Sequence, residues 1–427
     1  MVKGSNRVFI FKEGVTGMEQ RFYELLDLLV RFNTESPPGR NTDPLQDEIE
    51  QLLRDLGFEI QRERLYDNDS VIVATLKGED PEAPKLILNG HVDVASVEDD
   101  SNWDFPPFQL TEHEGWLYGR GVSDMKGGMA SLFYVLEKLH QEGRQPKGDI
   151  IVQSVVGEEV GEAGTKLACE IGPKADLALV LDTSENMALG QGGVITGWIT
   201  VKSKNTIHDG ARSQTIHAGG GLFGASAIEK MTKVIQALNE LEQHWAVMKH
   251  SPGMPPGANT INPAVIEGGR HPAFIADECR LWITVHYLPN ESYEEVVAEI
   301  EDYLNRVAEA DIWLRENPLQ FEWGGESMIE DKGEIFPSFT IPLDHPGFKQ
   351  LQKAHRDVHG SDMQHGMSTT VTDGGWTAHF GIPTILYGPG SLEEAHSVDE
   401  KIEAEELNTY SDVLYTFLKH WYEHPEK

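Results

Sequence analysis

The sequence has very little cysteine and no long apolar run. Cys169 and Cys279 are the only cysteines in 427 residues, so neither a disulfide framework nor a cysteine-based metal site is expected. No apolar stretch approaches the about 18 residues that a membrane-spanning helix needs, which excludes a membrane protein. We therefore expect a soluble protein of the reducing cytoplasm, in which any metal is held by His and carboxylate side chains.

Basic residues are also scarce. Lysine and arginine total 35 against 70 aspartates and glutamates, so the net charge is -35 at pH 7. Nucleic acids are bound by clustered Lys and Arg, and this composition therefore excludes a nucleic-acid partner. We interpret the acidity as a solubilising surface, with adaptation to salt or alkali, or a cationic substrate, as the alternatives.

Four short apolar runs share one pattern, because each is followed at once by polar or glycine residues. The runs are residues 85–90 before His91, 150–156 before Glu158 and Glu159, 177–181 before Asp182, and 383–387 before Gly388. They predict buried strands of a mostly parallel sheet, with helical patterns such as residues 129–139 as the crossovers. Ligands of such sheets bind beyond the carboxyl ends of the strands, so we expect the chemistry there.

The pattern changes between residues 194 and 325. A long strand at 193–203 and an amphipathic helix at 225–245 precede a strand at 278–288 and a helix that opens with Ser292 and Glu295 at capping-box spacing. We interpret this region as an α+β domain of helices on an antiparallel sheet. The length of the chain favours two domains, and the larger α/β domain would consist of residues 1–193 and 326–427.

Two segments supply the first candidate metal ligands. His91 and Asp93 are two residues apart on an extended segment and face the same side, so one can bind a metal while the other orients it. Asp124 lies among glycines at the entry to a helix. Tight backbone of this kind suits the placement of a bridging carboxylate, with a helix N-cap as the alternative.

Further acids and a second imidazole complete the candidate site. Glu158 and Glu159 are adjacent and would repel each other unless cations neutralise at least one, so one can bind metal while the other faces the substrate. Asp182 ends the next strand, and His396 follows a Gly-Pro-Gly turn. Two His with three acids suit zinc, with cobalt or manganese as substitutes.

Five segments resemble a family of two-zinc metallohydrolases that includes acetylornithine deacetylase, succinyl-diaminopimelate desuccinylase, aminoacylase and carboxypeptidase G. The segments are LILNGHVDV at 86–94, WLYGRGVSDMKGG at 116–128, GEEVGEAGT at 157–165, HAGGGLFGASAI at 217–228 and GIPTILYGPGSLEEAHSVDE at 381–400. They occur in the family's order over nearly the whole chain. The resemblance implies a zinc-peptidase-like catalytic domain with an inserted lid and dimerisation domain.

The resemblance also implies a role for each candidate residue and a cis peptide bond between Asp124 and Met125. Two metal ions would acidify a water that attacks an amide carbonyl, and the base would return its proton to the leaving nitrogen. In this scheme His91 and Asp182 hold one zinc, Glu159 and His396 hold the other, Asp124 bridges both, Asp93 orients His91, and Glu158 is the base.

The lid carries the remaining residues that the resemblance implies. His217 matches an imidazole that stabilises the oxyanion, typically in the partner subunit, so we expect a homodimer formed through the lid. His208 lies in a nearby segment and remains an alternative. Asn259 in the lid and Gly388 in the catalytic domain are expected to contact the substrate.

One departure from the family concerns the substrate. Family members that act on amino-acid derivatives commonly have an arginine before the lid's Leu-Pro turn, whereas this chain has His286. A neutral imidazole does not replace a guanidinium fork in gripping a carboxylate. The alternative is that Arg270 or Arg280 serves instead.

We therefore expect a small N-acyl substrate without a carboxylate, such as an N-formyl aminomethylpyrimidine. Trp198 or Trp282 would stack on its ring, with packing in the lid core as the alternative role of these tryptophans. The alternatives within the class are a deacylase similar to acetylornithine deacetylase or succinyl-diaminopimelate desuccinylase, and a metallo-carboxypeptidase. A noncatalytic binding or dimerisation relative is the alternative from another class. It predicts the loss of a ligand or of the base, and all of these residues are present.

Overall fold

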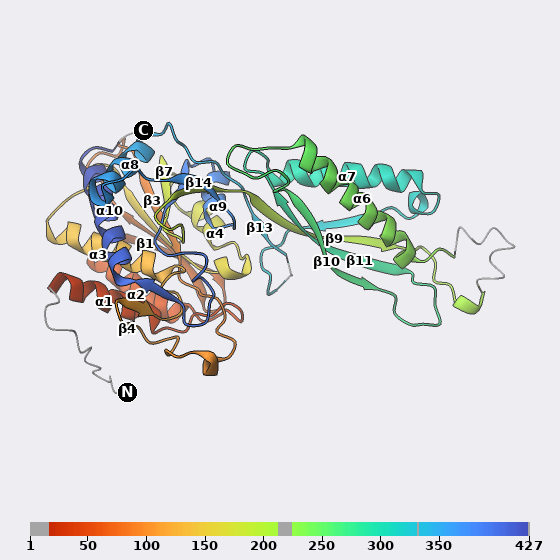
Figure 1. Cartoon of the computed structure of the whole chain (residues 1–427), viewed down its shortest axis with the longest axis horizontal. Helices are drawn as coiled ribbons and strands as arrows, with labels where there is room; N and C mark the ends of the chain where they lie inside the picture. Colours follow the sequence, from red (N-terminus) through yellow and green to blue (C-terminus); the bar gives the residue numbers. More distant parts are fainter. Residues whose placement is uncertain (1–16, 212–223, 331–332, 426–427) are drawn as a thin grey trace.

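The computed structural model describes residues 17–211, 224–330 and 333–425 and has two lobes (Figure 1). The larger lobe is built on an eight-stranded sheet and the smaller, elongated lobe on a five-stranded sheet. Each lobe has a hydrophobic core of its own. Among the helices that the structure describes, none is both long and apolar enough to cross a membrane.

The centre of the larger sheet consists of the strands that the apolar runs predict. β6, β3, β7 and β15 are adjacent and mutually parallel, and every residue in them is buried. The predicted mostly parallel sheet flanked by helices is thereby confirmed, with antiparallel pairings toward both edges. The strands in spatial order are β1 (Glu59–Tyr66), β2 (Asp69–Leu76), β6 (Ile150–Val155), β3 (Leu86–His91), β7 (Leu177–Val180), β15 (Thr384–Leu386), β8 (Ala188–Gln191) and β14 (His365–Ser368).

Helices cover both faces of this sheet (Figure 1). One group packs together through contacts of α10 with α3 and α8, and of α1 with α3. On the opposite face α4 contacts α9 and β6. The helices of the larger lobe are α1 (Gly17–Val30), α2 (Asp43–Asp55), α3 (Lys126–Gln141), α4 (Gly164–Ile171), α8 (Pro346–His359), α9 (Gly374–His379) and α10 (Ala404–Glu423). Its short 3-10 turns are η1 (Asp100–Asn102) and η2 (Glu158–Val160), and those of the smaller lobe are η3 (Asp209–Ala211) and η4 (Leu314–Glu316).

A small three-stranded sheet brings together two segments that are far apart in the sequence. It consists of β4 (Thr111–His113), β5 (Trp116–Tyr118) and β16 (Lys401–Glu403). Tyr118 pairs with Lys401, so the glycine-rich turn after β5 lies beside the segment that precedes β16. These two segments carry Asp124 and His396.

The smaller lobe packs two helices on its sheet. α6 (Ala227–Met248) and α7 (Tyr293–Ala310) cover strands in the order β10 (Thr260–Gly268), β11 (Glu278–Tyr287), β9 (Gly193–Lys202) and β12 (Gln320–Trp323). The capping box of Ser292 and Glu295 is present at the start of α7. β13 (Ile335–Phe336) also pairs with β9, and the domain limits at residues 194 and 325 stay a prediction.

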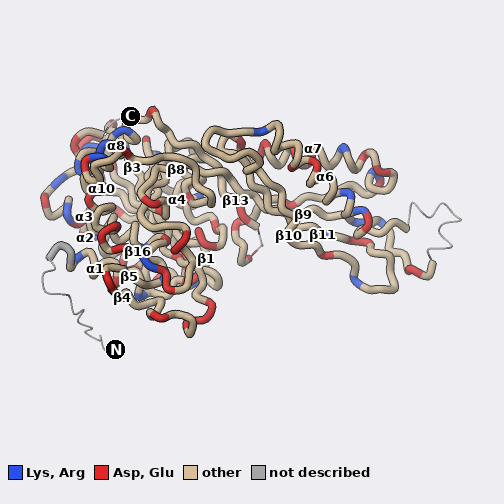
Figure 2. The backbone as a smooth tube through the Cα atoms, viewed as in Figure 1, with Lys and Arg blue, Asp and Glu red and all other residues tan. Residues whose placement is uncertain are grey.

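Charged residues occur on both lobes. Figure 2 shows Asp and Glu distributed over the whole backbone, with Lys and Arg between them. Some basic residues each contact several acids, as Arg62 does with Asp43, Asp47 and Glu50. This distribution agrees with an acidic surface whose role is mainly solvation.

Candidate metal centre and active site

The predicted ligands meet at one edge of the larger sheet. β3, β6 and β7 are parallel neighbours, so His91, the Glu158-Glu159 pair and Asp182 all follow the carboxyl ends of adjacent strands. His91 and Asp182 are buried there. The other two ligands, Asp124 and His396, reach the same edge from the loops beside β5 and β16.

Asp124 lies between two imidazoles. Its Oδ1 is 3.2 Å from His91 Nε2, and its Oδ2 is 3.3 Å from His396 Nε2. Each imidazole also has a second acid nearby. His396 Nε2 is 2.9 Å from Glu159 Oε2, and His91 Nε2 is 3.9 Å from Asp182 Oδ2. This arrangement places one carboxylate between two groups of ligand atoms.

The residues present fit a metal ion. Ligand atoms of His91, Asp124 and Glu159 all lie within 4.8 Å of one another. His91 Nε2 and Glu159 Oε1 are buried, and neither has a hydrogen-bond partner among the described residues. An unpaired buried polar group costs about 1–3 kcal/mol. A divalent cation between these atoms would remove that cost.

The electrostatics of the cluster are those of a cation site. Burial raises the pKa of Glu159 to about 7 and that of Asp182 to about 8. Hydrogen bonding to Asp124 and Glu159 raises the pKa of His396 to about 10. Burial opposes the ionisation of Asp124, but His396 and His91 outweigh it and hold the pKa of Asp124 well below its usual range. The site thus concentrates acids that need compensating positive charge.

Glu158 and Glu159 face different ways from one tight turn. Glu159 contacts His396, whereas Glu158 Oε2 lies 3.9 Å from His91 Nε2. Burial raises the pKa of Glu158 well above its usual range, and the charges of Asp182 and Asp373 add to the increase. A carboxyl group of raised pKa at the edge of a metal cluster suits proton transfer.

Asp93 connects His91 to the turn that carries Glu159. His91 Nδ1 is 3.0 Å from the backbone oxygen of Asp93 and 3.7 Å from its Oδ1. Asp93 Oδ2 accepts a hydrogen bond of 3.1 Å from the backbone N–H of Glu159. Contact of the Nδ1 atom with an acceptor leaves Nε2 as the nitrogen that faces the cluster.

A buried ion pair holds the Asp124 turn against the His396 loop, and the sequence reasoning missed it. The Glu400 carboxylate accepts from the backbone N–H groups of Gly121, Ser123 and Asp124 at 2.9, 2.8 and 3.0 Å. Arg120 Nη1 donates to Glu400 at 2.8 Å, and its Nη2 lies 3.4 Å from the carbonyl oxygen of His396. The only sequence signal was that both residues lie within the two segments that carry Asp124 and His396.

The peptide bond between Asp124 and Met125 is cis, as expected from the family resemblance. α3 begins at Lys126, and Met125 occupies its N-cap position. The alternative that the Asp124 side chain caps this helix therefore does not hold.

A second missed residue is Asp373, which precedes α9. Both carboxylate oxygens are buried, and neither has a hydrogen-bond partner in the described part of the chain. Burial raises the pKa of Asp373 to about 7, and its charge acts on Glu158. No spacing pattern distinguished it, because it reaches the site through a loop after β14.

A cleft of about 390 Å³ lies between the two lobes. Its lining includes His286 from the lid and, from the larger lobe, Met367 and the loop that continues to Asp373. Burial lowers the pKa of His286, so the imidazole is neutral near pH 7. The full lining is Gly192, Gly193, Gly253, Met254, Pro255, Ala258, His286, Tyr287, Met367, Ser368, Thr369, Thr370 and Val371.

Asn259 lies next to the cleft lining, whereas Gly388 is buried behind Asp182. Asn259 follows Ala258 of the cleft lining, and its buried amide has no hydrogen-bond partner at Nδ2 or Oδ1 among the described residues. Gly388 is buried behind Asp182, where a Cβ would lie 2.1 Å from the Asp182 carbonyl oxygen. Its N–H and C=O both bond to Ser184, so a substrate contact at Gly388 stays a prediction without support from this geometry.

The other aromatic and cationic candidates of the lid lie away from the cleft lining. Trp198 and Trp282 pack edge to face with their ring centroids 5.3 Å apart, and Arg280 lies over Trp198. Arg270 pairs with Asp277 and Arg280 with Glu322. Stacking of a substrate on these tryptophans, or an anchoring role for these arginines, is not supported by this arrangement.

His217 lies outside the described residues. η3, the last element before that gap, lies at the end of the lid far from the larger lobe (Figure 1). His208 is exposed in the same region, and its Nδ1 accepts from the N–H of Gly210. His208 of one chain is therefore remote from the metal cluster of that chain.

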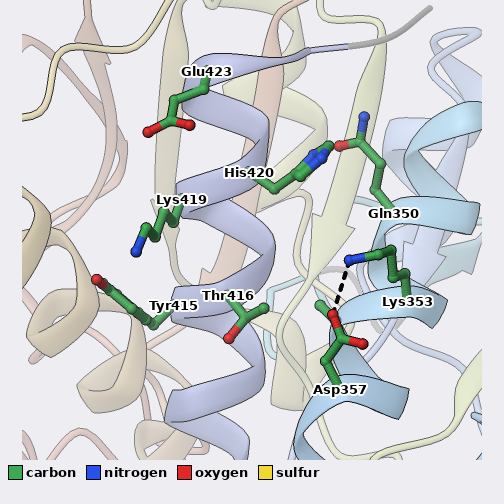
Figure 3. A pocket seen from close by; sticks show the side chains of 9 residues that line it. Gln350, Lys353, Asp357, Tyr415, Thr416, Lys419, His420 and Glu423 are labelled. Carbon is green, nitrogen blue, oxygen red and sulfur yellow. Dashed lines mark hydrogen bonds and ion pairs between the residues drawn. The ribbon is translucent and has the colours of Figure 1, made fainter.

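A further groove lies between α8 and α10 (Figure 3). Lys353 and Asp357 pair with each other across one turn of α8. None of the predicted site residues lines this groove, and we assign it no part in the chemistry. The lining residues are Gln350, Lys353, Ala354, Asp357, Tyr415, Thr416, Lys419, His420 and Glu423.

The fold and this site define a class of protein. Residues 87–420 match peptidase family M20/M25/M40, and the chain belongs to that family. Among solved structures, a family M20 metallo-carboxypeptidase from Sulfolobus solfataricus has a TM-score of 0.68 at 14% identity and covers 95% of this chain and 100% of its own. A dinuclear metal-binding M20 peptidase from Bacillus subtilis has a TM-score of 0.64 at 14% identity, covering 95% and 99%. These two likenesses concern the fold alone.

Two relatives are much more similar in sequence. The N-formyl-4-amino-5-aminomethyl-2-methylpyrimidine deformylase of Halalkalibacterium halodurans is 56% identical over 419 residues, which are 97% of this chain and 98% of that protein. The deformylase of the same name from Bacillus subtilis is 51% identical over 416 residues, again 97% and 98% of the two chains.

Metal binding should release protons. The pKa values of His396 and Asp182 are raised to about 10 and about 8, so both residues retain protons in the metal-free site at pH 7. Metal ligands must be deprotonated, so these protons must leave when a metal ion binds. Calorimetric titration of metal-free protein with zinc at pH 7 should therefore give an enthalpy that varies with the ionisation enthalpy of the buffer. His396→Ala should reduce the number of protons released. An enthalpy that is the same in all buffers would contradict this description of the site.

Proposed function

We propose that this protein is a metal-dependent amidohydrolase that hydrolyses N-formyl-4-amino-5-aminomethyl-2-methylpyrimidine to formate and the free aminomethylpyrimidine. The observation that carries the proposal is the identity of 56% and 51%, over 97% of the chain, to two deformylases of that name. The family supports metal-dependent removal of an acyl group. The alternative substrates, N-acetylornithine, succinyl-diaminopimelate and C-terminal peptides, belong to relatives of much lower identity or of similar fold only.

Two divalent cations are proposed to bind at the cluster. His91 and Asp182 would hold one, Glu159 and His396 the other, and Asp124 both, which agrees with the distances around Asp124. Imidazole and carboxylate donors suit zinc, with cobalt or manganese as substitutes. When bound, the cations would acidify a water molecule and polarise the amide carbonyl.

Glu158 is proposed as the general base and then the general acid. Its carboxylate would take a proton from the attacking water and deliver it to the amine nitrogen as the bond from nitrogen to the formyl carbon breaks. Its raised pKa makes the carboxylate a stronger proton acceptor, and its position beside His91 places it at the edge of the cluster. Asp93 would orient His91 through the contact at Nδ1.

The cleft between the lobes is proposed to hold the pyrimidine ring. Met254 and Met367 line it with thioethers, which make favourable contacts with aromatic rings. The neutral His286 and the unpartnered amide of Asn259 offer hydrogen bonds without a fixed charge. This lining suits a polar aromatic ring that has no carboxylate.

A homodimer through the lid is also proposed. β10 is the edge strand of the lid sheet, and its Val265 and Ile266 are exposed. An exposed apolar edge strand is a surface for pairing with another chain. His217, which lies outside the described residues, is proposed from the family resemblance to act in the site of a partner subunit. The two free cysteines agree with the cytoplasmic location that we propose.

Glu158→Gln should lower kcat by about 100- to 10,000-fold, the usual contribution of a general base. Elemental analysis should still find both metals, because Glu158 is not a proposed ligand. His396→Ala is the matched control and should lose metal as well as activity. Metal loss in Glu158→Gln would assign Glu158 to the metal site, and an unchanged kcat would remove it from the reaction.

The enzyme should prefer substrates without a carboxylate, because His286 stands where an arginine would bind that group. The kcat/KM for the N-formyl pyrimidine should exceed that for N-acetylornithine by about 100-fold or more. His286→Arg should narrow this ratio, because a guanidinium fork binds carboxylates. Arg280→Met, at an arginine outside the cleft lining, should leave the ratio unchanged. A preference of the native protein for N-acetylornithine would contradict the proposed substrate.

Ile266→Lys should weaken self-association, because it places a charge on the proposed pairing edge. Sedimentation equilibrium should show a dimer for the native chain and a larger monomer fraction for the variant. Ile312→Lys is a suitable control, since Ile312 is an equally apolar and exposed lid residue outside β10. A native protein that sediments as a monomer would contradict the proposed assembly.

A further inference from the structure

Arg40 contacts three separate segments of the chain. Its guanidinium lies 2.8 Å from Glu162 Oε1, 2.9 Å from Glu330 Oε1 and 3.2 Å from Asp69 Oδ2. Its position is well fixed, because the Asp69 carboxylate also accepts from the backbone N–H of Arg40 at 2.7 Å. The guanidinium stacks over the ring of Tyr66 at 3.8 Å. Arg40 is thus held from several sides.

The contact with Glu162 reaches the catalytic turn. The Glu162 side chain is fully buried, and Arg40 donates to both of its carboxylate oxygens, at 3.0 and 2.8 Å. The backbone N–H of Glu162 donates to the carbonyl of Gly157 at 2.7 Å and so closes the turn that contains Glu158 and Glu159. Gly157 has φ of +87°, and a Cβ there would lie 2.4 Å from the Glu162 Cβ. The position of Glu162 therefore constrains the directions in which the side chains of Glu158 and Glu159 leave the turn.

The same contacts hold the segment that connects β12 to β13. Ser327 Oγ donates to Glu162 at 2.5 Å, and the N–H of Met328 donates to the carbonyl of Val160 at 3.0 Å. Glu330 in this segment contacts Arg40 directly. The segment between the lid strands β12 and β13 is therefore attached to the turn that carries the base.

We infer that Arg40 is a positioning residue that acts on Glu158 through Glu162 and ties the catalytic turn to the segment between the lid strands β12 and β13. The inference rests on the proposed role of Glu158. It gives Arg40 a part in the reaction that no spacing or family motif indicates. Arg40 does not need to touch the substrate for this role.

Arg62 offers a matched control for the test. It also contacts three acids, Asp43, Asp47 and Glu50, and its side chain is 23% exposed against 21% for Arg40. These partners lie on α2 and not on the catalytic turn. Loss of Arg62 therefore removes an ion cluster of the same size without disturbing residues 157–162.

The experiment compares Arg40→Met, Arg62→Met, Glu162→Gln and the double variant Arg40→Met with Glu162→Gln, all loaded with zinc. Arg40→Met should lower kcat by about 10- to 100-fold while KM changes by less than about threefold, because misplacement of the base affects the transition state more than substrate binding. Both metals should be retained. The double variant should lose no more than the more affected single variant, since both changes break one connection.

Hydrogen exchange gives a readout that does not depend on turnover. Arg40→Met should accelerate exchange in peptides covering residues 157–162 and 325–330, and Arg62→Met should leave both peptides unchanged. A kcat for Arg40→Met within about twofold of native, an equal loss in Arg62→Met, or unchanged exchange in residues 157–162 would each overturn the inference. If the native protein does not hydrolyse the formylpyrimidine, the proposed function fails, and the exchange data still decide the positioning role.

Discussion

The buried ion pair between Arg120 and Glu400 is the interaction on which the site depends. Asp124 must lie beside an imidazole from a distant part of the chain, and this pair joins the Asp124 turn to the His396 loop. Glu400 accepts three backbone N–H groups of the Asp124 turn, while Arg120 contacts carbonyls of the His396 loop. A buried pair is favourable only when such extra hydrogen bonds compensate for desolvation. Here they compensate for it and also fix the geometry of the two segments.

The parallel centre of the sheet supplies the other half of the site. Adjacent strand ends deliver His91, Glu159 and Asp182 to one edge, where burial makes the negative charge of the two carboxylates unfavourable. In the metal-free state protons compensate for this charge in part, and metal ions would compensate for it more fully. The affinity for cations thus arises from the same burial that the folded sheet imposes. The cleft between the lobes, which is proposed to hold the pyrimidine ring, is lined by groups that carry no fixed charge.

The central strands and the candidate ligands were predictable because each is a local signal. An apolar run followed by an acid indicates a strand end, and the glycine-rich turn around Asp124 indicates a placed carboxylate. Arg120 with Glu400, and Arg40 with Glu162, were not predictable, since each pair joins residues more than 100 positions apart. Asp373 and the cleft lining other than His286 were missed for the same reason. Trp198 and Trp282 pack against each other, as the core alternative for these residues allowed.

We propose that Asp124 would be a ligand of two metal ions, each held by a separate imidazole. Anomalous scattering from crystals grown with zinc tests it most directly. We expect two peaks, both in contact with Asp124, one beside His91 and Asp182 and the other beside Glu159 and His396. A single peak, or two peaks of which one does not touch Asp124, would contradict it.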